Sequence, residues 1–286
     1  MALANLREML SEARKNKYGI PSLLAGNLEM VIAQITAAEA QRAPLILAFN
    51  QEVTPKVPVE LAMPLIVNAA RRAKVPVATI LDHGQSLEDV LKAIFLGTSS
   101  VMFDGSSLPY EENVRQTKEI VRIAHALGVC VEGELGSIAG SAASPEKSGP
   151  ESCFTDPDMA AEFVERTGVD VLAISFGNVH GIYKGEPNLD LDRVRKIHAL
   201  LDIPLAMHGA SGLAESEYKK IIESGISKVC YYTAMGIEAS NHLRRMMTDA
   251  GQNVVVYHDI ISWAIDCFYV ETKELLDILG CSGSVN

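Results

Sequence analysis

Eight short apolar runs, separated by longer segments with helical periodicity, constrain the fold of this chain most strongly. The runs span residues 20–24, 44–50, 75–81, 99–103, 129–134, 169–175, 203–207 and 227–231. Helical periodicity covers segments such as residues 29–42, 59–72, 87–96, 110–127, 157–166, 191–200 and 215–223. Near-continuous apolar strands that alternate with amphipathic helices are typical of parallel sheets covered by helices. Eight strand-and-helix units predict an α/β fold, a single (β/α)8 TIM barrel.

The length of the chain agrees with one barrel. Barrels of this type typically have about 250 residues, and this chain has 286. We therefore expect a single TIM-barrel domain over residues 1–286. One segment lacks regular periodicity, because residues 136–152 are rich in Gly, Ser, Ala and Pro and follow the fifth apolar run. This composition favours a mobile loop at about residues 136–152.

Charge and targeting signals exclude several classes of partner. The formal net charge of −11 disfavours nucleic acid and anionic membrane surfaces, because both attract basic patches. The amino-terminal segment lacks the apolar core of a signal peptide, and no stretch approaches the roughly 18 apolar residues of a membrane span. We therefore expect a cytoplasmic protein. The five cysteines form no C-x-x-C pair, which argues against a disulfide framework or a cysteine zinc site.

Polar side chains gather where the predicted strands end, which is where such a barrel places its catalytic groups. These residues are Asp82, His83, Asp104, Glu132, Glu134, Asn178, His180 and His208. Three neutral imidazoles that leave a fourth position open form the ligand set of a catalytic zinc ion. We therefore predict that His83, His180 and His208 bind Zn2+ or another divalent metal. The alternative, a histidine that merely ends a strand, explains one such residue better than three together.

The other polar residues have simpler interpretations. We expect Asp104 and Glu132 to accept hydrogen bonds from the metal-binding imidazoles and so to fix their tautomers. The remaining histidines are expected in structural or surface positions, and they are His125, His198, His242 and His258.

Two glycine-containing turns follow the predicted metal ligands. The first contains Gly181 and is followed by Lys184, and the second contains Gly209 and Ser211. Exposed backbone amides at such turns, aided by a hydroxyl and an ammonium group, favour a phosphate-binding site. Alternatively, the glycines only provide the tight geometry between strand and helix.

Five sequence blocks resemble the class II ketose-bisphosphate aldolases. They read LDHG at 81–84, VMFDGS at 101–106, EGELG at 132–136, GNVHGIYKGEP at 177–187 and HGASG at 208–212. In this order they are similar to zinc-dependent fructose- and tagatose-bisphosphate aldolases over nearly the whole chain. The resemblance implies a metal-dependent enzyme that cleaves a phosphorylated ketose reversibly into dihydroxyacetone phosphate and an aldehyde. It also implies a homodimer or homotetramer with a role in carbohydrate metabolism such as glycolysis.

The same resemblance implies roles for individual residues. It makes His83, His180 and His208 the zinc ligands, places Glu134 at an alternative metal position, and assigns the proton of the C4 oxygen to Asp82. The positions that match those binding the phosphate and a nearby monovalent cation, Na+ or K+, are Gly181, Lys184, Gly209, Ser211 and Thr233.

Several residues of the substrate pocket depart from the family pattern. Leu24 and Cys230 each stand where the family has an asparagine that faces the substrate, and Asn50 stands where it has a serine. Tyr232 replaces an acidic or amide residue near the phosphate. We expect Asn50 and Cys230 to line the substrate pocket, and we expect Leu24, Cys230 and Tyr232 to make that pocket less polar than is usual in the family.

The predicted loop departs as well. Ala142 stands where the family has a glutamate that moves a carbon-bound proton, and Glu146 and Glu151 are the candidates to replace it. Two alternatives to the leading hypothesis therefore stay open: an aldolase with a changed donor or acceptor, and a metal-binding paralogue without activity. A zinc hydrolase on a similar barrel is disfavoured, because the five blocks match aldolases in order.

Overall fold

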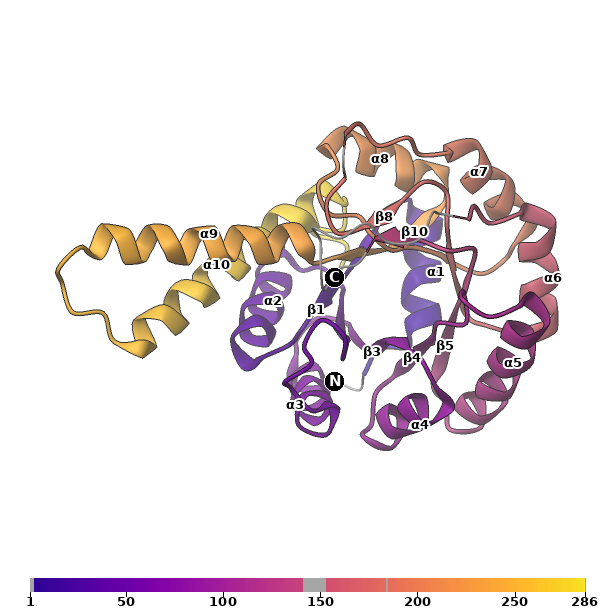
Figure 1. Cartoon of the computed structure of the whole chain (residues 1–286), viewed down its shortest axis with the longest axis horizontal. Helices are drawn as coiled ribbons and strands as arrows, with labels where there is room; N and C mark the ends of the chain where they lie inside the picture. The colour runs from indigo at the N-terminus through magenta and orange to yellow at the C-terminus, as the bar shows by residue number, and fades with distance from the viewer. Residues whose placement is uncertain (1–2, 141–152, 184, 286) are drawn as a thin grey trace.

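The computed structural model describes residues 3–140, 153–183 and 185–285, and eight of its strands close into a parallel barrel (Figure 1). The barrel strands are β1 (Ile20–Leu24), β2 (Leu45–Phe49), β3 (Val77–Gly84), β4 (Ser100–Phe103), β5 (Cys130–Leu135), β7 (Val171–Ile174), β9 (Leu205–Met207) and β10 (Ile226–Tyr231). Their order around the ring is β1-β10-β9-β7-β5-β4-β3-β2, and each neighbouring pair is parallel. The predicted TIM barrel is confirmed.

In the described ranges, seven helices lie between successive barrel strands and cover the outside of the ring. They are α2 (Leu28–Gln41), α3 (Val59–Arg72), α4 (Leu87–Phe95), α5 (Tyr110–Ala126), α6 (Pro157–Thr167), α7 (Leu191–Leu200) and α8 (Glu215–Ser224). The start of α6 shows how sequence sets these boundaries. The Asp156 side chain accepts hydrogen bonds from the amides of Asp158 and Met159, and Pro157 occupies the first turn, where no amide proton is needed.

Helix α1 (Leu6–Asn16) precedes the first strand and closes one end of the barrel. Its apolar side chains, including Leu6 and Leu10, are fully buried against residues of the barrel interior such as Ile46 and Ile80. Figure 1 shows α1 lying across the opening of the ring. The other end of the barrel, where the strands finish, is therefore the end that is left open to a substrate.

Helices α9 (Thr233–Ala250) and α10 (Tyr257–Ile278) form a hairpin that projects from the barrel, at the left of Figure 1. The eight strand-and-helix units predict a helix after the eighth apolar run, but the sequence pattern set no bounds for it. Because α10 packs against both α9 and α2, its apolar residues do not form the single stripe by which a surface helix is recognised. At the tip of the hairpin, Val254 is 89% exposed.

A small second sheet lies next to the barrel. It pairs β6 (Ala139–Gly140) with β8 (Val179–His180) in parallel. All five cysteines are free thiols, as their spacing predicts. Within the described ranges no helix is both long and apolar enough to cross a membrane.

Candidate metal and substrate site

The carboxyl ends of the barrel strands surround a cavity of about 510 Å³. The site residues that were predicted from the sequence and that the structure describes all line it: Asn50, Asp82, His83, Glu134, His180, Gly181, His208, Gly209, Ser211, Cys230 and Thr233. Lys184 lies outside the described residues, as do residues 141–152, which include Ala142, Glu146 and Glu151. The parallel strands thus bring residues from distant parts of the chain to one end of the barrel.

His83 lies where β3 leaves the regular strand ladder. The pairing of β3 with β4 shifts register between Leu81 and Gly84, and His83 has a φ of 51°, in the left-handed region that residues other than glycine rarely adopt. Its Nδ1 atom is 2.8 Å from Oδ2 of Asp104. The other oxygen of Asp104 accepts hydrogen bonds from the amide and hydroxyl of Ser106. Asp104 therefore fixes the orientation of the His83 ring.

His208 is oriented by a buried charge pair. Its Nε2 atom is 2.9 Å from Oε1 of Glu132, and Oε2 of Glu132 accepts a 2.6 Å hydrogen bond from Nζ of Lys228. All three side chains are buried. Burial raises the pKa of Glu132, but the charges of Lys228 and His208 outweigh that effect and hold the pKa below its ordinary value. Glu132 is therefore ionised and holds His208 with Nδ1 toward His83.

His180 lies on β8, and two glycines permit other backbone segments to approach this strand closely. A Cβ atom at Gly140 would lie 2.2 Å from the carbonyl oxygen of His180, and one at Gly209 would lie 2.1 Å from that of Val179. The Nε2 atom of His180 is buried and has no hydrogen-bond partner among the described residues. Burying such an atom without a partner costs free energy, so this nitrogen is suited to a ligand.

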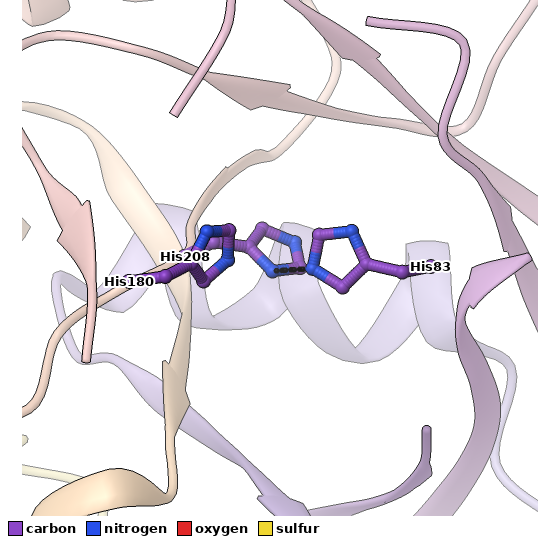
Figure 2. Close-up of side chains that lie close together, drawn as sticks. All are labelled: His83, His180 and His208. Carbon is purple, nitrogen blue, oxygen red and sulfur yellow. Dashed lines mark hydrogen bonds between the residues drawn. The ribbon is translucent and has the colours of Figure 1, made fainter. Parts of the chain in front are cut away.

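The three imidazoles meet in one place (Figure 2). One ring nitrogen of each lies within 4.8 Å of the others, and Nε2 of His83 is 3.0 Å from Nδ1 of His208. Zinc has bonds of about 2.0–2.1 Å to histidine, which places two ligand nitrogens about 3.3 Å apart in tetrahedral geometry. The spacing and the unpartnered nitrogen of His180 both fit a divalent metal ion, and carboxylates hold the rings of His83 and His208 from behind, as is typical of such sites.

Two carboxylates in the cavity differ in ionisation. Burial raises the pKa of Asp82, but the positive charges of His83, His208 and Lys228 outweigh it and lower the pKa to about 2. Burial raises the pKa of Glu134 to about 8, aided by the negative charge of Asp104. Asp82 is therefore ionised at neutral pH, whereas Glu134 holds its proton. Each has an oxygen without a hydrogen-bond partner in the described part of the chain, Oδ1 of Asp82 and Oε2 of Glu134.

One side of the cavity, formed by the turns after β8, β9 and β10, offers backbone rather than charge. Gly181, Gly209 and Ser211 line it, followed by Thr233, where the 18-residue helix α9 begins. The residue before α9 makes no side-chain hydrogen bond that would cap the helix. The first amide groups of a helix are left without intrahelical partners and carry partial positive charge, so this side of the cavity is suited to an anion.

The residues that depart from the family pattern also line the cavity. They are Leu24, Asn50, Cys230 and Tyr232. The Sγ atom of Cys230 is 3.7 Å from Nε2 of His208, and burial raises the pKa of its thiol, which keeps that thiol neutral. Asn50 donates a 3.4 Å hydrogen bond to Oδ2 of Asp82.

Sequence reasoning did not single out two residues, Lys228 and Ser22. Lys228 is fully buried in β10, and Ser22 lines the cavity with a buried hydroxyl that has no partner among the described residues. For Lys228 a signal was present, since a lysine within an apolar strand run needs a buried counter-charge. Ser22 gave no such signal, because serine is unremarkable in a strand.

Comparison with known proteins relates the chain to one family. The family model described as class II fructose-bisphosphate aldolase matches residues 4–284. The fructose-bisphosphate aldolase of Geobacillus stearothermophilus is 38% identical over 252 residues, which cover 86% of each chain. The uncharacterized protein YdjI of Escherichia coli (strain K12) is 39% identical over 233 residues, or 82% of this chain and 84% of that one.

Solved structures agree with the fold. The crystal structure of the YdjI aldolase from Escherichia coli K12 superposes with a TM-score of 0.87 at 33% identity, covering 99% of this chain and 100% of that one. A fructose-bisphosphate aldolase from Campylobacter jejuni has a TM-score of 0.79 at 21% identity, covering 98% and 95% of the two chains, which is a likeness of fold.

Proposed function

This chain belongs to the class II fructose-bisphosphate aldolase family, and we propose that it cleaves a phosphorylated ketose reversibly between C3 and C4. The products are dihydroxyacetone phosphate and an aldehyde. The observation that carries the proposal is the convergence of three imidazoles beside the ionised Asp82, in a cavity that also has a side suited to an anion. A lyase of this class needs all three features in one place.

We propose that His83, His180 and His208 hold a divalent metal, with zinc the best fit because nitrogen ligands in this number and spacing suit it. When bound, the metal acts as a Lewis acid that draws electron density from the ketose oxygens. Glu134 is the proposed ligand of an alternative metal position. One of its oxygens is free of partners in the described ranges, and groups of possible metal ligands include both the three histidines and His83 with Asp104 and Glu134.

Asp82 is the proposed acid and base at C4. In the cleavage direction its carboxylate removes the proton of the C4 hydroxyl group, so that C4 becomes the carbonyl carbon of the aldehyde. In the condensation direction it returns that proton. The low pKa of about 2 ensures that the carboxylate form is present at neutral pH, and the hydrogen bond from Asn50 orients it.

The phosphate of the dihydroxyacetone portion is the proposed ligand of the backbone around Gly181, Gly209, Ser211 and Thr233. Backbone amides and the start of α9 supply positive potential there. Lys184 and a monovalent cation, Na+ or K+, are proposed to complete this phosphate site. The carbon-bound proton at C3 requires a further group, for which Glu146 and Glu151 are proposed.

A homodimer or homotetramer in the cytoplasm is part of the proposal. Exposed apolar side chains on the outer elements support an assembly, since Leu61 on α3 is 70% exposed and Tyr257 on the projecting hairpin is 73% exposed.

The experiment that tests the proposed function is a coupled assay of dihydroxyacetone phosphate release by zinc-loaded protein. The substrates are fructose and tagatose as 1-phosphates and as 1,6-bisphosphates. We expect release from at least one of them. If zinc-loaded protein releases nothing from any, the alternative of a metal-binding paralogue without activity replaces this proposal. Ester and amide substrates in parallel test for a hydrolase.

A further inference from the structure

The charges inside the cavity are unevenly distributed. Among the described residues that line it there are four carboxylate side chains and no lysine or arginine. The carboxylates belong to Glu52, Asp82, Asp104 and Glu134. Asp82 and Asp104 lie beside the imidazoles, and Glu134 lies close to His83 and Asp104 in a group of possible metal ligands. Glu52 lies outside these groups around the histidines. It makes no ion pair within the described part of the chain, so its charge is available to a substrate.

The anion-binding backbone and Glu52 lie on opposite sides of the ring. Gly181, Gly209, Ser211 and Thr233 follow β7, β9 and β10, and we call them the phosphate wall. Asn50, Glu52, Gln85, Ser106 and Ser107 follow β2, β3 and β4, and we call them the aldehyde wall. In the ring order β9 lies across from β3, β7 from β2 and β10 from β4. The histidine cluster lies between the two walls, so a ketose that reaches it spans both.

Asn50 fixes Glu52 relative to the proposed acid and base. The side-chain oxygen of Asn50 accepts hydrogen bonds from the amides of Glu52 (2.9 Å) and Val53 (3.2 Å). Its side-chain nitrogen donates to Asp82. One buried amide group therefore joins the turn that carries Glu52 to the carboxylate at the reacting carbon. Glu52 is itself exposed at the cavity, where its carboxylate keeps its solvent.

The aldehyde wall suits hydroxyl groups and opposes a phosphate. Amide, hydroxyl and carboxylate groups all accept or donate hydrogen bonds to sugar hydroxyls. A phosphate ester carries nearly two negative charges, and placing it beside Glu52 and Asp82 without a cation is unfavourable. The described residues thus offer a site for one phosphate, on the phosphate wall.

We propose that the substrate is a ketose with a single phosphate, on the dihydroxyacetone portion, and that Glu52 selects an aldehyde portion that is polyhydroxylated and carries no phosphate. This inference rests on the proposed function above. In the reaction the bond between C3 and C4 breaks, and its electron pair stays on C3, which takes up a proton. The C4 hydroxyl proton passes to Asp82, so no oxidant or reductant is needed.

The test compares phosphorylated with unphosphorylated aldehydes in the condensation direction, using zinc-loaded full-length protein and dihydroxyacetone phosphate. Glycolaldehyde and glycolaldehyde phosphate are the matched pair, because neither has a stereocentre. We expect kcat/KM to favour glycolaldehyde by at least about tenfold. An equal or greater value for the phosphorylated aldehyde overturns this inference alone. Condensation with neither aldehyde, together with no cleavage of any ketose phosphate, overturns the proposed function and this inference with it.

Charge reversal at two positions distinguishes a local effect of the Glu52 carboxylate from an effect of the net charge of the protein. Glu52→Lys should shift the kcat/KM ratio toward the phosphorylated aldehyde by at least about threefold. Glu223→Lys, at an exposed position on α8, makes the same change of charge away from the cavity and should leave the ratio unchanged. If both variants give the wild-type ratio, or if both shift it equally, Glu52 does not select the aldehyde and the inference fails.

Discussion

The Nε2 atom of His83 and the Nδ1 atom of His208 face each other at 3.0 Å, and each ring has its other nitrogen on a carboxylate. If each ring gives its one proton to Asp104 or Glu132, two lone pairs meet, and a proton or a metal ion must lie between them. Burial lowers the pKa of His83, but Asp82 and Asp104 outweigh it and raise the pKa to about 10. A metal that binds here therefore displaces a proton.

Removal of one imidazole should abolish both metal binding and turnover. In His83→Ala, only two of the three ring nitrogens remain, and the carboxylate of Asp82 loses the positively charged imidazole beside it. We expect metal content to fall to background and activity to disappear, as measured by elemental analysis and dihydroxyacetone phosphate release. His258→Ala, on the exposed surface of α10, is the control and should behave as wild type. Normal metal content and full activity in His83→Ala would show that the metal site is misassigned.

Asp82→Ala should separate chemistry from metal binding. Asp82 lies beside the histidine cluster without contributing one of the three imidazole nitrogens, so the metal should stay bound. The rate should fall by roughly 10² or more, the usual effect of losing a general acid or base. Asp82→Asn keeps the shape of the side chain and should be similarly slow. A variant as fast as wild type contradicts the proposed role in proton transfer.

Lys228→Met should weaken the protein and its metal site together. The substitution leaves the fully buried carboxylate of Glu132 without its cation, and breaking a buried pair costs about 3–5 kcal/mol of unfolding free energy. Denaturant titration measures that loss, and competition with a chelator measures metal affinity. The double variant Glu132→Gln/Lys228→Met removes both charges and should recover part of the stability. Unchanged stability in the single variant would show that the pair is not buried in solution.

Glu134 should make the chelator-treated protein less stable as pH rises. Burial and the charge of Asp104 raise its pKa to about 8 in the folded chain, against about 4.3 for an unfolded glutamate. The folded state then binds this proton more tightly. The stability it contributes is present below about pH 4 and is lost as pH rises toward 8.

Glu134→Gln cannot lose a proton and should remove this pH dependence. The unfolding free energy of Glu134→Gln minus that of wild type should be larger at pH 8.5 than at pH 5, by up to a few kcal/mol. Urea titration at the two pH values measures the change, with Glu223→Gln on α8 as an exposed control. The same difference between wild type and Glu134→Gln at both pH values contradicts a raised pKa.

The barrel was predictable because its signals are local. Each strand is an apolar run, and boundaries such as Asp156 and Pro157 carry their own capping chemistry. The bounds of α9 and α10 were not predicted, because α10 divides its apolar residues between two neighbours, and this division is set by tertiary packing.

The residues of the site were predictable from the sequence where a polar side chain lies at the end of a predicted strand. His83, His180 and His208 do so, and the topology brings them together. The charges and hydrogen-bond partners that surround each ionisable side chain were not predictable from the sequence. The buried pairing of Lys228 with Glu132 joins residues 96 positions apart, and the different ionisation of Asp82 and Glu134 depends on which charges lie near each carboxylate.

The most direct test of a catalytic metal at the three histidines is a titration of chelator-treated protein with zinc while dihydroxyacetone phosphate release is followed. The substrate is the ketose phosphate that wild-type protein cleaves fastest. If the three histidines hold a catalytic metal, the rate should start near zero, rise in proportion to added zinc and level off at one ion per chain. Full turnover by protein shown to be free of metal would contradict a catalytic role for a metal at His83, His180 and His208.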